Sequence, residues 1–197
     1  MNDIQPLEQH FEIFSGHHFR GKIKGLPSGP IQVLQPRDFK AGEVQHTPLR
    51  IFDTENNILY SRQELQNKDI LLPNKGTLLH PVWFQAGDLH SVATSSFFVI
   101  RQRNTGALLP KYVYWLLQQP IINRYLLQAL TKSTVPSLSV KPVRAMEIPV
   151  PPRNTQEHIA ELVDQVQQEK ELLKQKMHNR QQWLNSYCWE RLKPHLS

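Results

Sequence analysis

The feature that most constrains this chain is residues 153–193, a long stretch that contains neither glycine nor proline. Glutamine, glutamate, lysine and leucine dominate it, and all four are good helix formers. Apolar residues recur in it at alternating spacings of three and four, which is the pattern of a coiled-coil seam. The sequence therefore predicts one long helix with an apolar stripe along it.

The predicted seam includes one charged position. Its members are Ile159, Val163, Val166, Lys170, Leu173, Met177 and Leu184. A helix over residues 155–191 is about 55 Å long at ~1.5 Å per residue, which exceeds the width of a small domain. Such a helix cannot bury its whole seam against its own domain, so we expect a partner helix whose register Lys170 helps to fix. The alternative is a solvated helix lying partly along its own domain, because Lys170 and Arg180 interrupt the stripe.

The start of this helix is marked by a proline pair, Pro151-Pro152, where the composition changes. Asn154 stands where an N-cap residue is expected, and Glu157 follows three residues later, as in a capping box. The chain is long enough for one sizeable core plus such an appendage. We therefore expect a domain over residues 1–152 and a spacer or dimerisation helix over residues 153–197.

The first part of the chain has the sequence of a loop-rich β domain. Glycines punctuate short strand-like runs, as expected for turns between strands. These runs are residues 31–35, 49–53, 58–60, 69–72, 81–85 and 91–101, and the last is the strongest. Two helices follow, opened by Pro110 and Pro120, then a loop at 131–136 and strand-like sequence at 140–150.

The net charge and the cysteine content narrow the classes of function that this chain can have. The net charge is +6, so nucleic acid is the first acidic partner to test. Cys188 is the sole cysteine, which excludes an internal disulfide and a cysteine-based zinc site. The polar N-terminal sequence is unlike a signal peptide, and no apolar run approaches the ~20 residues of a membrane span. We expect a cytoplasmic protein without a membrane partner.

Signatures of catalysis are missing from the sequence. It has no phosphate-binding loop and no dinucleotide fingerprint, and it lacks the Asn/Asp-Pro-Pro-Tyr/Phe cluster of an amino-methyltransferase. The nearest approach to a metal-dependent nuclease is Asp38 close to Lys40, without a neighbouring second acid. His17 and His18 would point to opposite faces of a strand and cannot share a metal. We expect no catalytic residues, no cofactor and no metal.

Basic and polar loops are the positive signal for nucleic-acid binding. Cations, hydroxyls and backbone N–H groups in loops suit contacts to phosphates and base edges. Arg20, Lys22 and Lys24 share one face if their segment is extended, although a solvated edge strand protected by lysines gives the same pattern. The candidate DNA-binding residues are Arg20, Lys22, Lys24, Arg37, Lys75, Thr77, His80, Lys132, Ser133 and Thr134.

The order of motifs along the chain adds a resemblance. A Gly-rich basic opening precedes Lys68-Asp69-Ile-Leu-Leu72, Asn74-Lys-Gly-Thr77 and a Phe-Phe-Val-Ile strand. A helix pair, Ser137-Leu-Ser139 and Ile148-Pro-Val-Pro-Pro152 then lead to Gln156 and Ile159-Ala160. This order resembles the specificity (S) subunit of type I restriction-modification systems, and more narrowly one target-recognition domain followed by one conserved spacer helix. Thr155 before Gln156 departs from the usual Glu-Gln pair.

The resemblance implies an α/β (α+β) fold, with a curved mixed β-sheet, short helices and a long C-terminal coiled-coil helix. It implies a non-catalytic subunit that recognises a bipartite DNA sequence and directs methyltransferase (M) and restriction (R) subunits to it. Known S subunits generally hold two such units and this sequence holds one, so we expect a homodimer through the helix. Two alternatives are a specificity module of another DNA-defence complex and a coiled-coil interaction protein without a DNA role.

Overall fold

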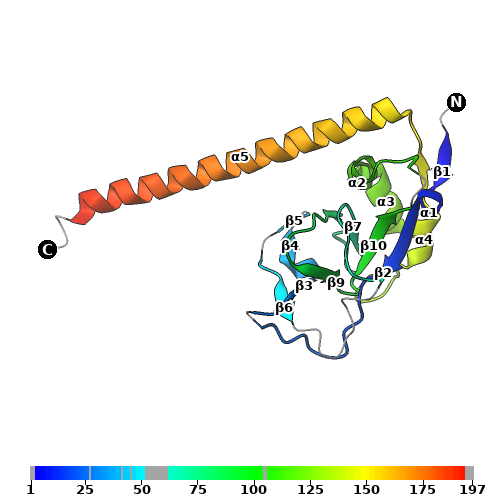
Figure 1. The fold of residues 1–197 in the computed structure, drawn as a ribbon, viewed down its shortest axis with the longest axis horizontal. Helices are drawn as coiled ribbons and strands as arrows, with labels where there is room; N and C mark the ends of the chain where they lie inside the picture. Colours follow the sequence, from blue (N-terminus) through cyan, green and yellow to red (C-terminus); the bar gives the residue numbers. More distant parts are fainter. Residues whose placement is uncertain are drawn as a thin grey trace.

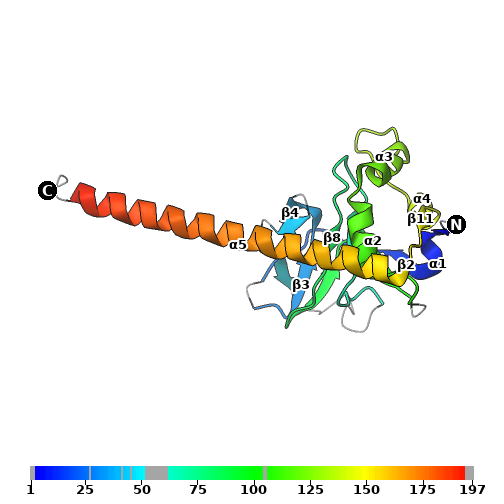
Figure 2. The ribbon, with the colours of Figure 1, turned by 90° about the horizontal axis from the view of Figure 1, so that it is seen from above.

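The computed structural model describes residues 3–26, 28–40, 42–44, 46–51, 62–103 and 106–193. A body of short strands and helices carries one long helix, α5 (Arg153–Leu192), whose C-terminal half extends beyond it (Figures 1 and 2). None of the described helices is long and apolar enough to cross a membrane. The strand predicted at 58–60 and the end of the one predicted at 49–53 lie outside the described residues.

The centre of the body is an antiparallel sheet with the order β2-β10-β7-β8. Its strands are β2 (Phe11–Ser15), β10 (Phe97–Gln102), β7 (Ile70–Pro73) and β8 (Val82–Trp83). Successive residues of β10 alternate between two cores, with Phe98 and Ile100 on one face and Phe97 and Val99 on the other. Because both faces are buried there, the first four residues of β10 are all apolar, as the sequence predicted, and Arg101 and Gln102 follow at its half-buried end.

Two further layers cover this sheet. One face packs on the helices α1 (Leu7–His10), α2 (Pro110–Leu117), α3 (Pro120–Gln128) and α4 (Val140–Arg144). Beyond the other core lies a mixed sheet of β6 (Leu49–Ile51), β3 (Ile31–Leu34) and β9 (His90–Ala93), in which β3 and β9 are parallel. The pairs β1 (Ile4–Pro6) with β11 (Glu147–Pro149) and β4 (Phe39–Lys40) with β5 (Glu43–Val44) complete the fold, and a 3-10 turn (Pro36–Asp38) precedes β4.

The two sheets come close together at Gly16, just after β2. A Cβ atom there would lie 2.4 Å from the carbonyl oxygen of Thr94, closer than real Cβ atoms approach. The next residue, His17, forms a bridge with Thr94 and donates its N–H to the carbonyl oxygen of Ala93 at 2.7 Å. A glycine is therefore required where β2 meets the end of β9.

Two predicted elements differ from the structure. The strand expected over residues 91–101 is two strands, β9 and β10, separated by a turn in which Phe97 donates its N–H to the carbonyl oxygen of Thr94 at 2.9 Å. The strand expected over residues 140–150 is α4 followed by β11. Pro142 is tolerated in α4 because it lies in the first turn, where backbone N–H groups have no partner within the helix.

The predicted capping box is wrong. The helix begins at Arg153, with Pro152 at the N-cap position and no side-chain cap, so Asn154 lies inside the first turn. The side chain of Glu157 instead forms an ion pair with Arg153 at 2.9 Å, one turn away. A proline at the boundary provides the extended backbone that an N-cap needs, with no side-chain hydrogen bond.

Four sets of polar contacts hold α5 against the body, and the first is a hydrogen bond from Arg153 to the carbonyl oxygen of Gly106 at 3.1 Å. Gln156, 1% exposed, is anchored at the base of the helix. Farther along, Asp164 forms an ion pair with Lys111 of α2 at 2.8 Å, and Lys174 forms one with Glu43 of β5 at 2.5 Å. The hydrogen bond with Glu43 raises the pKa of Lys174. From Asp164 to its end the helix is otherwise exposed to solvent.

Candidate nucleic-acid interface

Three polar loop segments lie together at one end of the strands of the central sheet. β2 and β7 both pair antiparallel with β10, so the C-terminal ends of β2 and β7 lie beside the N-terminal end of β10. The residues that follow or precede these ends are Gly16 and His17, Asn74 to Thr77, and Ser95 and Ser96. Backbone N–H groups and hydroxyls are therefore concentrated at this end.

Asn74 joins two of these connections from a buried position. Its backbone N–H donates to the carbonyl oxygen of Ser96 at 2.9 Å, and its side-chain amide donates to that of Ser95 at 3.0 Å. These bonds fix the turn that begins at Asn74, and they leave Lys75 and Thr77 exposed. Asn74 thus positions two of the predicted DNA-binding side chains.

The structure brings a second predicted loop, residues 131–136, against this turn. Lys75 forms an isolated bridge with Ser137, and Gly76 donates its N–H to the carbonyl oxygen of Pro136 at 2.8 Å. Leu138 donates its N–H to the carbonyl oxygen of Asn74, also at 2.8 Å. Two of the predicted polar loops are therefore neighbours.

Hydroxyl groups shape the second loop from within. The hydroxyl of Thr131 accepts the N–H of Ser137 at 3.0 Å and lies 3.0 Å from the hydroxyl of Ser133. Ser133 donates its own hydroxyl to the carbonyl oxygen of Val135 at 2.8 Å. Ser133 therefore supports the turn, while Lys132 and Thr134 beside it are exposed.

A groove of about 450 Å³ lies between these loops and α4. Lys75 and Arg144 bring positive charge to it, and Arg144 is held in place by hydrogen bonds from its Nη2 and Nε to the carbonyl oxygen of Ile13, at 2.7 and 3.3 Å. Its other lining residues are Phe14, Ser15, Asn74, Ser95, Phe98, Ser137, Leu138, Ser139 and Val140. Cations with hydroxyl and amide groups suit contact with a phosphodiester backbone.

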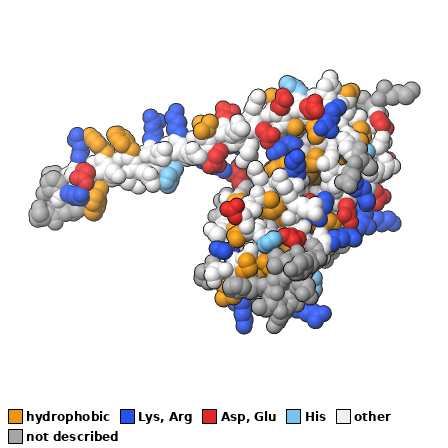
Figure 3. Space-filling view, viewed as in Figure 1, with side chains coloured by type: hydrophobic (Ala, Val, Ile, Leu, Met, Phe, Trp, Pro, Cys, Tyr) orange, Lys and Arg blue, Asp and Glu red, His pale blue; other side chains and the backbone are white. Residues whose placement is uncertain are grey.

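We call the groove and the two loops the strand-end site. Lys and Arg side chains stand out along the rim of the body on the side away from α5 (Figure 3).

Within the part of the chain that the structure describes, no three His, Cys, Asp or Glu side chains are grouped so that they could hold a metal ion. Arg144 was not among the predicted site residues, because its segment was assigned to a strand.

The third predicted basic segment lies elsewhere. No strand forms over residues 19–25, and Gly21 has a φ of +83°, which breaks an extended alternation. Phe19 and Ile23 pack against the core of the three-stranded sheet, so Arg20, Lys22 and Lys24 face solvent. These three remain candidate DNA contacts on a loop rather than on a strand.

The remaining candidate DNA-binding residues lie outside the strand-end site. Arg37 is exposed in the 3-10 turn, and His80 is exposed in the connection between β7 and β8. Trp83 is half-buried against Tyr114, and the Nζ of Lys111 lies 4.0 Å from its ring centroid.

Arg101 is a structural residue. It forms an ion pair with the buried Asp69 through two nitrogens at 2.6 and 2.9 Å, and it also donates to the carbonyl oxygen of Glu64 at 2.7 Å.

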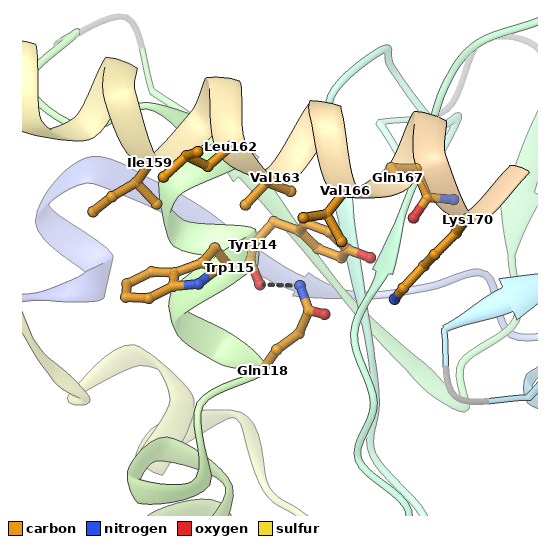
Figure 4. Close-up of a pocket in the computed structure, with 9 residues that line it drawn as sticks. All are labelled: Tyr114, Trp115, Gln118, Ile159, Leu162, Val163, Val166, Gln167 and Lys170. Carbon is orange, nitrogen blue, oxygen red and sulfur yellow. Dashed lines mark hydrogen bonds between the residues drawn. The ribbon is translucent and has the colours of Figure 1, made fainter. Parts of the chain in front are cut away.

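A second surface follows the first turns of α5, where the helix passes α2. A cavity of about 280 Å³ opens there, and Ile159, Val163 and Val166 of α5 line it opposite Trp115 and Gln118 (Figure 4). A second cavity of about 360 Å³ adjoins it and shares Trp115 and Ile159. We call the two together the α2–α5 trough.

Comparison with known proteins identifies the fold family. A family model described as the type I restriction modification DNA specificity domain matches residues 8–179. The chain belongs to this family. The match extends from α1 well into α5, so this specificity domain includes both the body and most of the long helix. A search of curated protein sequences found no match.

Solved structures show the same fold for this specificity domain. They include an S subunit of a type I restriction-modification system from M. genitalium (TM-score 0.60, 16% identity) and the HsdS subunit from Thermoanaerobacter tengcongensis (0.60, 17%). A structure from a study of type I R-M complex assembly is also similar (0.62, 16%). The alignments cover 87–88% of this specificity domain and 39–40% of those chains, so it spans about two fifths of their length.

Proposed function

We propose that this chain is the DNA sequence-recognition component of a type I restriction-modification assembly. Membership of the DNA specificity family supports this assignment, and the observation that carries it is the strand-end site, where two basic polar loops meet over a groove. Cations there hold the phosphate backbone, which sets the position of the protein on the duplex. Polar loop residues then reach base edges and select the sequence.

The proposed role assigns a different task to each part of the chain and to its partner subunits. Residues 1–152 act as the recognition domain and residues 153–197 as the spacer helix. Chemistry on DNA belongs to M and R subunits, and this chain supplies neither a catalytic residue nor a cofactor. The double-stranded target is bipartite, and each copy of this chain recognises one half of it.

We propose that two copies pair through α5, which supplies the two recognition domains that a bipartite target needs. The predicted seam residues Val166, Leu173, Met177 and Leu184 are between 45% and 72% exposed, so no part of the chain that the structure describes covers them. Ile159 and Val163, closer to the body, are half-buried. An antiparallel pair places one recognition body at each end of the paired helices, as a split target requires.

Salt-dependent duplex binding tests the recognition role. Each phosphate contact contributes about 0.9 to the slope of log affinity against log salt concentration. Replacing Lys75 or Lys132 with alanine is therefore expected to lower the slope by roughly one and to weaken specific and non-specific duplexes alike. Lys176→Ala, at an exposed position on the distal part of α5, serves as the matched control. Unchanged slopes in both site variants would remove the strand-end site from the proposed DNA face.

A further inference from the structure

The charges of α5 are divided between its two halves. Residues 153–171 carry five acidic and two basic side chains, whereas residues 172–193 carry one acidic and five basic side chains. A parallel in-register pair would place the basic halves beside each other. An antiparallel pair instead places the acidic half of one helix beside the basic half of the other, which is favourable.

The register of such a pair follows from the seam. With Ile159 opposite Leu184 of a second copy, Val166 lies opposite Met177, and Lys170 lies opposite Leu173. Shifting the pair by one heptad in one direction places Lys170 opposite Arg180, which sets like charges together. Shifting it in the other direction places Leu184 opposite Pro152, before the helix begins, and so removes Leu184 from the paired seam. The first register is therefore preferred.

In the preferred register the C-terminal turns of the second helix reach the base of the first. The segment 177–187 of one copy then lies over residues 156–166 of the other, which is the part of α5 that borders the α2–α5 trough. This segment holds Trp183 and Tyr187, whose rings stack with centroids 5.2 Å apart and are largely exposed. Apolar side chains near the end of one helix, which no described residue of their own chain buries, thus lie against an apolar trough of the other copy.

The trough has room and the right chemistry for that segment. Its two cavities of about 280 and 360 Å³ lie on either side of Trp115 and Ile159. Leu162 and Val166 on its rim are about half exposed, and Gln118 closes one side with its amide donating to the carbonyl oxygen of Tyr114 at 3.1 Å (Figure 4). Burial, and to a lesser extent the carboxylate of Glu43, raises the pKa of Tyr114, so this side chain stays neutral at the trough.

We infer that the α2–α5 trough is the docking site for the C-terminal segment of a second copy, with Leu184 and Tyr187 packed against Ile159 and Trp115. This inference rests on the proposed antiparallel pairing and adds a contact between each recognition body and the helix of its partner. The partner's segment then contacts α2 of the body as well as α5, in addition to the contacts that already hold the body on its own helix. The docking would therefore fix the angle between the two DNA-reading bodies.

Gln118 provides the test, because it belongs to the body and not to the helix seam. In the preferred register Arg180 of the partner lies opposite Val163, close to Gln118 in the trough. Gln118→Lys is therefore expected to weaken the dimer roughly threefold to tenfold, and Gln118→Glu to strengthen it, as charges at an interface rim do. Combining Gln118→Lys with Arg180→Glu is expected to restore the affinity. Dissociation constants from sedimentation equilibrium at low salt give the comparison.

Two controls separate this inference from the pairing on which it rests. Gln128→Lys adds the same charge at an exposed position of α3 outside the trough, and we expect it to leave the dimer unchanged. Val166→Glu with Leu173→Lys places charge in the seam, and we expect it to give monomers with a folded body. Dimers that survive the seam change would overturn the pairing itself. Monomeric seam variants together with a Gln118→Lys protein that behaves like Gln128→Lys would overturn the docking site alone.

Discussion

Gln156 is the buried polar residue of α5, and its side chain ties the helix to residues 107–109 and to the proline pair that precedes it. Its side-chain oxygen accepts the N–H of Leu109 at 2.8 Å, and its amide donates to the carbonyl oxygens of Ala107 and Pro151 at 3.0 and 2.9 Å. The base of the helix is thereby tied to the segment that precedes α2. One glutamine thus sets where the helix leaves the body.

Replacing Gln156 with methionine is expected to destabilise the protein. Methionine has a similar length, but it leaves the N–H of Leu109 without its acceptor, a loss of about 1–3 kcal/mol for a group shielded from water. Chemical denaturation of the two proteins measures the difference. Gln165→Met, on an exposed turn of the same helix, is the control and is expected to change stability little. Equal losses at both positions would contradict the role of Gln156.

At the scale of elements, the sequence predicted what local periodicity determines. The long helix follows from an unbroken run of good helix formers, which forms the 40 residues of α5, and the FFVI strand follows from its continuous apolar run. The proline-rich segment 140–150 misled the prediction because its three valines and two prolines are as typical of an edge strand as of a short helix. The neighbouring loops at Lys75 and Ser137 could not be predicted, since they are joined by backbone bonds between residues far apart in the sequence.

The direction of helix pairing can be measured without changing the sequence, because Cys188 is the sole cysteine and is exposed. A spin label on Cys188 in a parallel dimer would lie within about 20 Å of its counterpart. The preferred antiparallel register instead predicts about 50 Å between labels, and the register shifted by one heptad about 40 Å, at ~1.5 Å per residue. Labels at Glu171→Cys in a Cys188→Ala background, near the two-fold axis, should be close together. A short distance at Cys188 would contradict antiparallel pairing.

In the whole molecule, the proposed DNA-binding site and the proposed dimer contact lie on different sides of the body. α5 runs along one side, and Lys and Arg side chains stand out along the rim of the body on the side away from it (Figures 1 and 3). The strand-end site follows the ends of three strands in the central sheet, and the trough forms where α2 supports α5. We therefore propose that DNA and a second copy bind at the same time.

A two-fold pair of identical bodies has a direct consequence for the DNA target. Each body reads the same half-site in opposite orientations, so the full site is an inverted repeat with a spacer of fixed length. Selection of bound duplexes from a random library, with the methyltransferase subunit present, tests this most directly. The wild type is expected to select an inverted repeat, and the Val166→Glu, Leu173→Lys variant a single half-site with weaker binding. Selection of an asymmetric bipartite site, with this chain as the only specificity chain, would contradict the account.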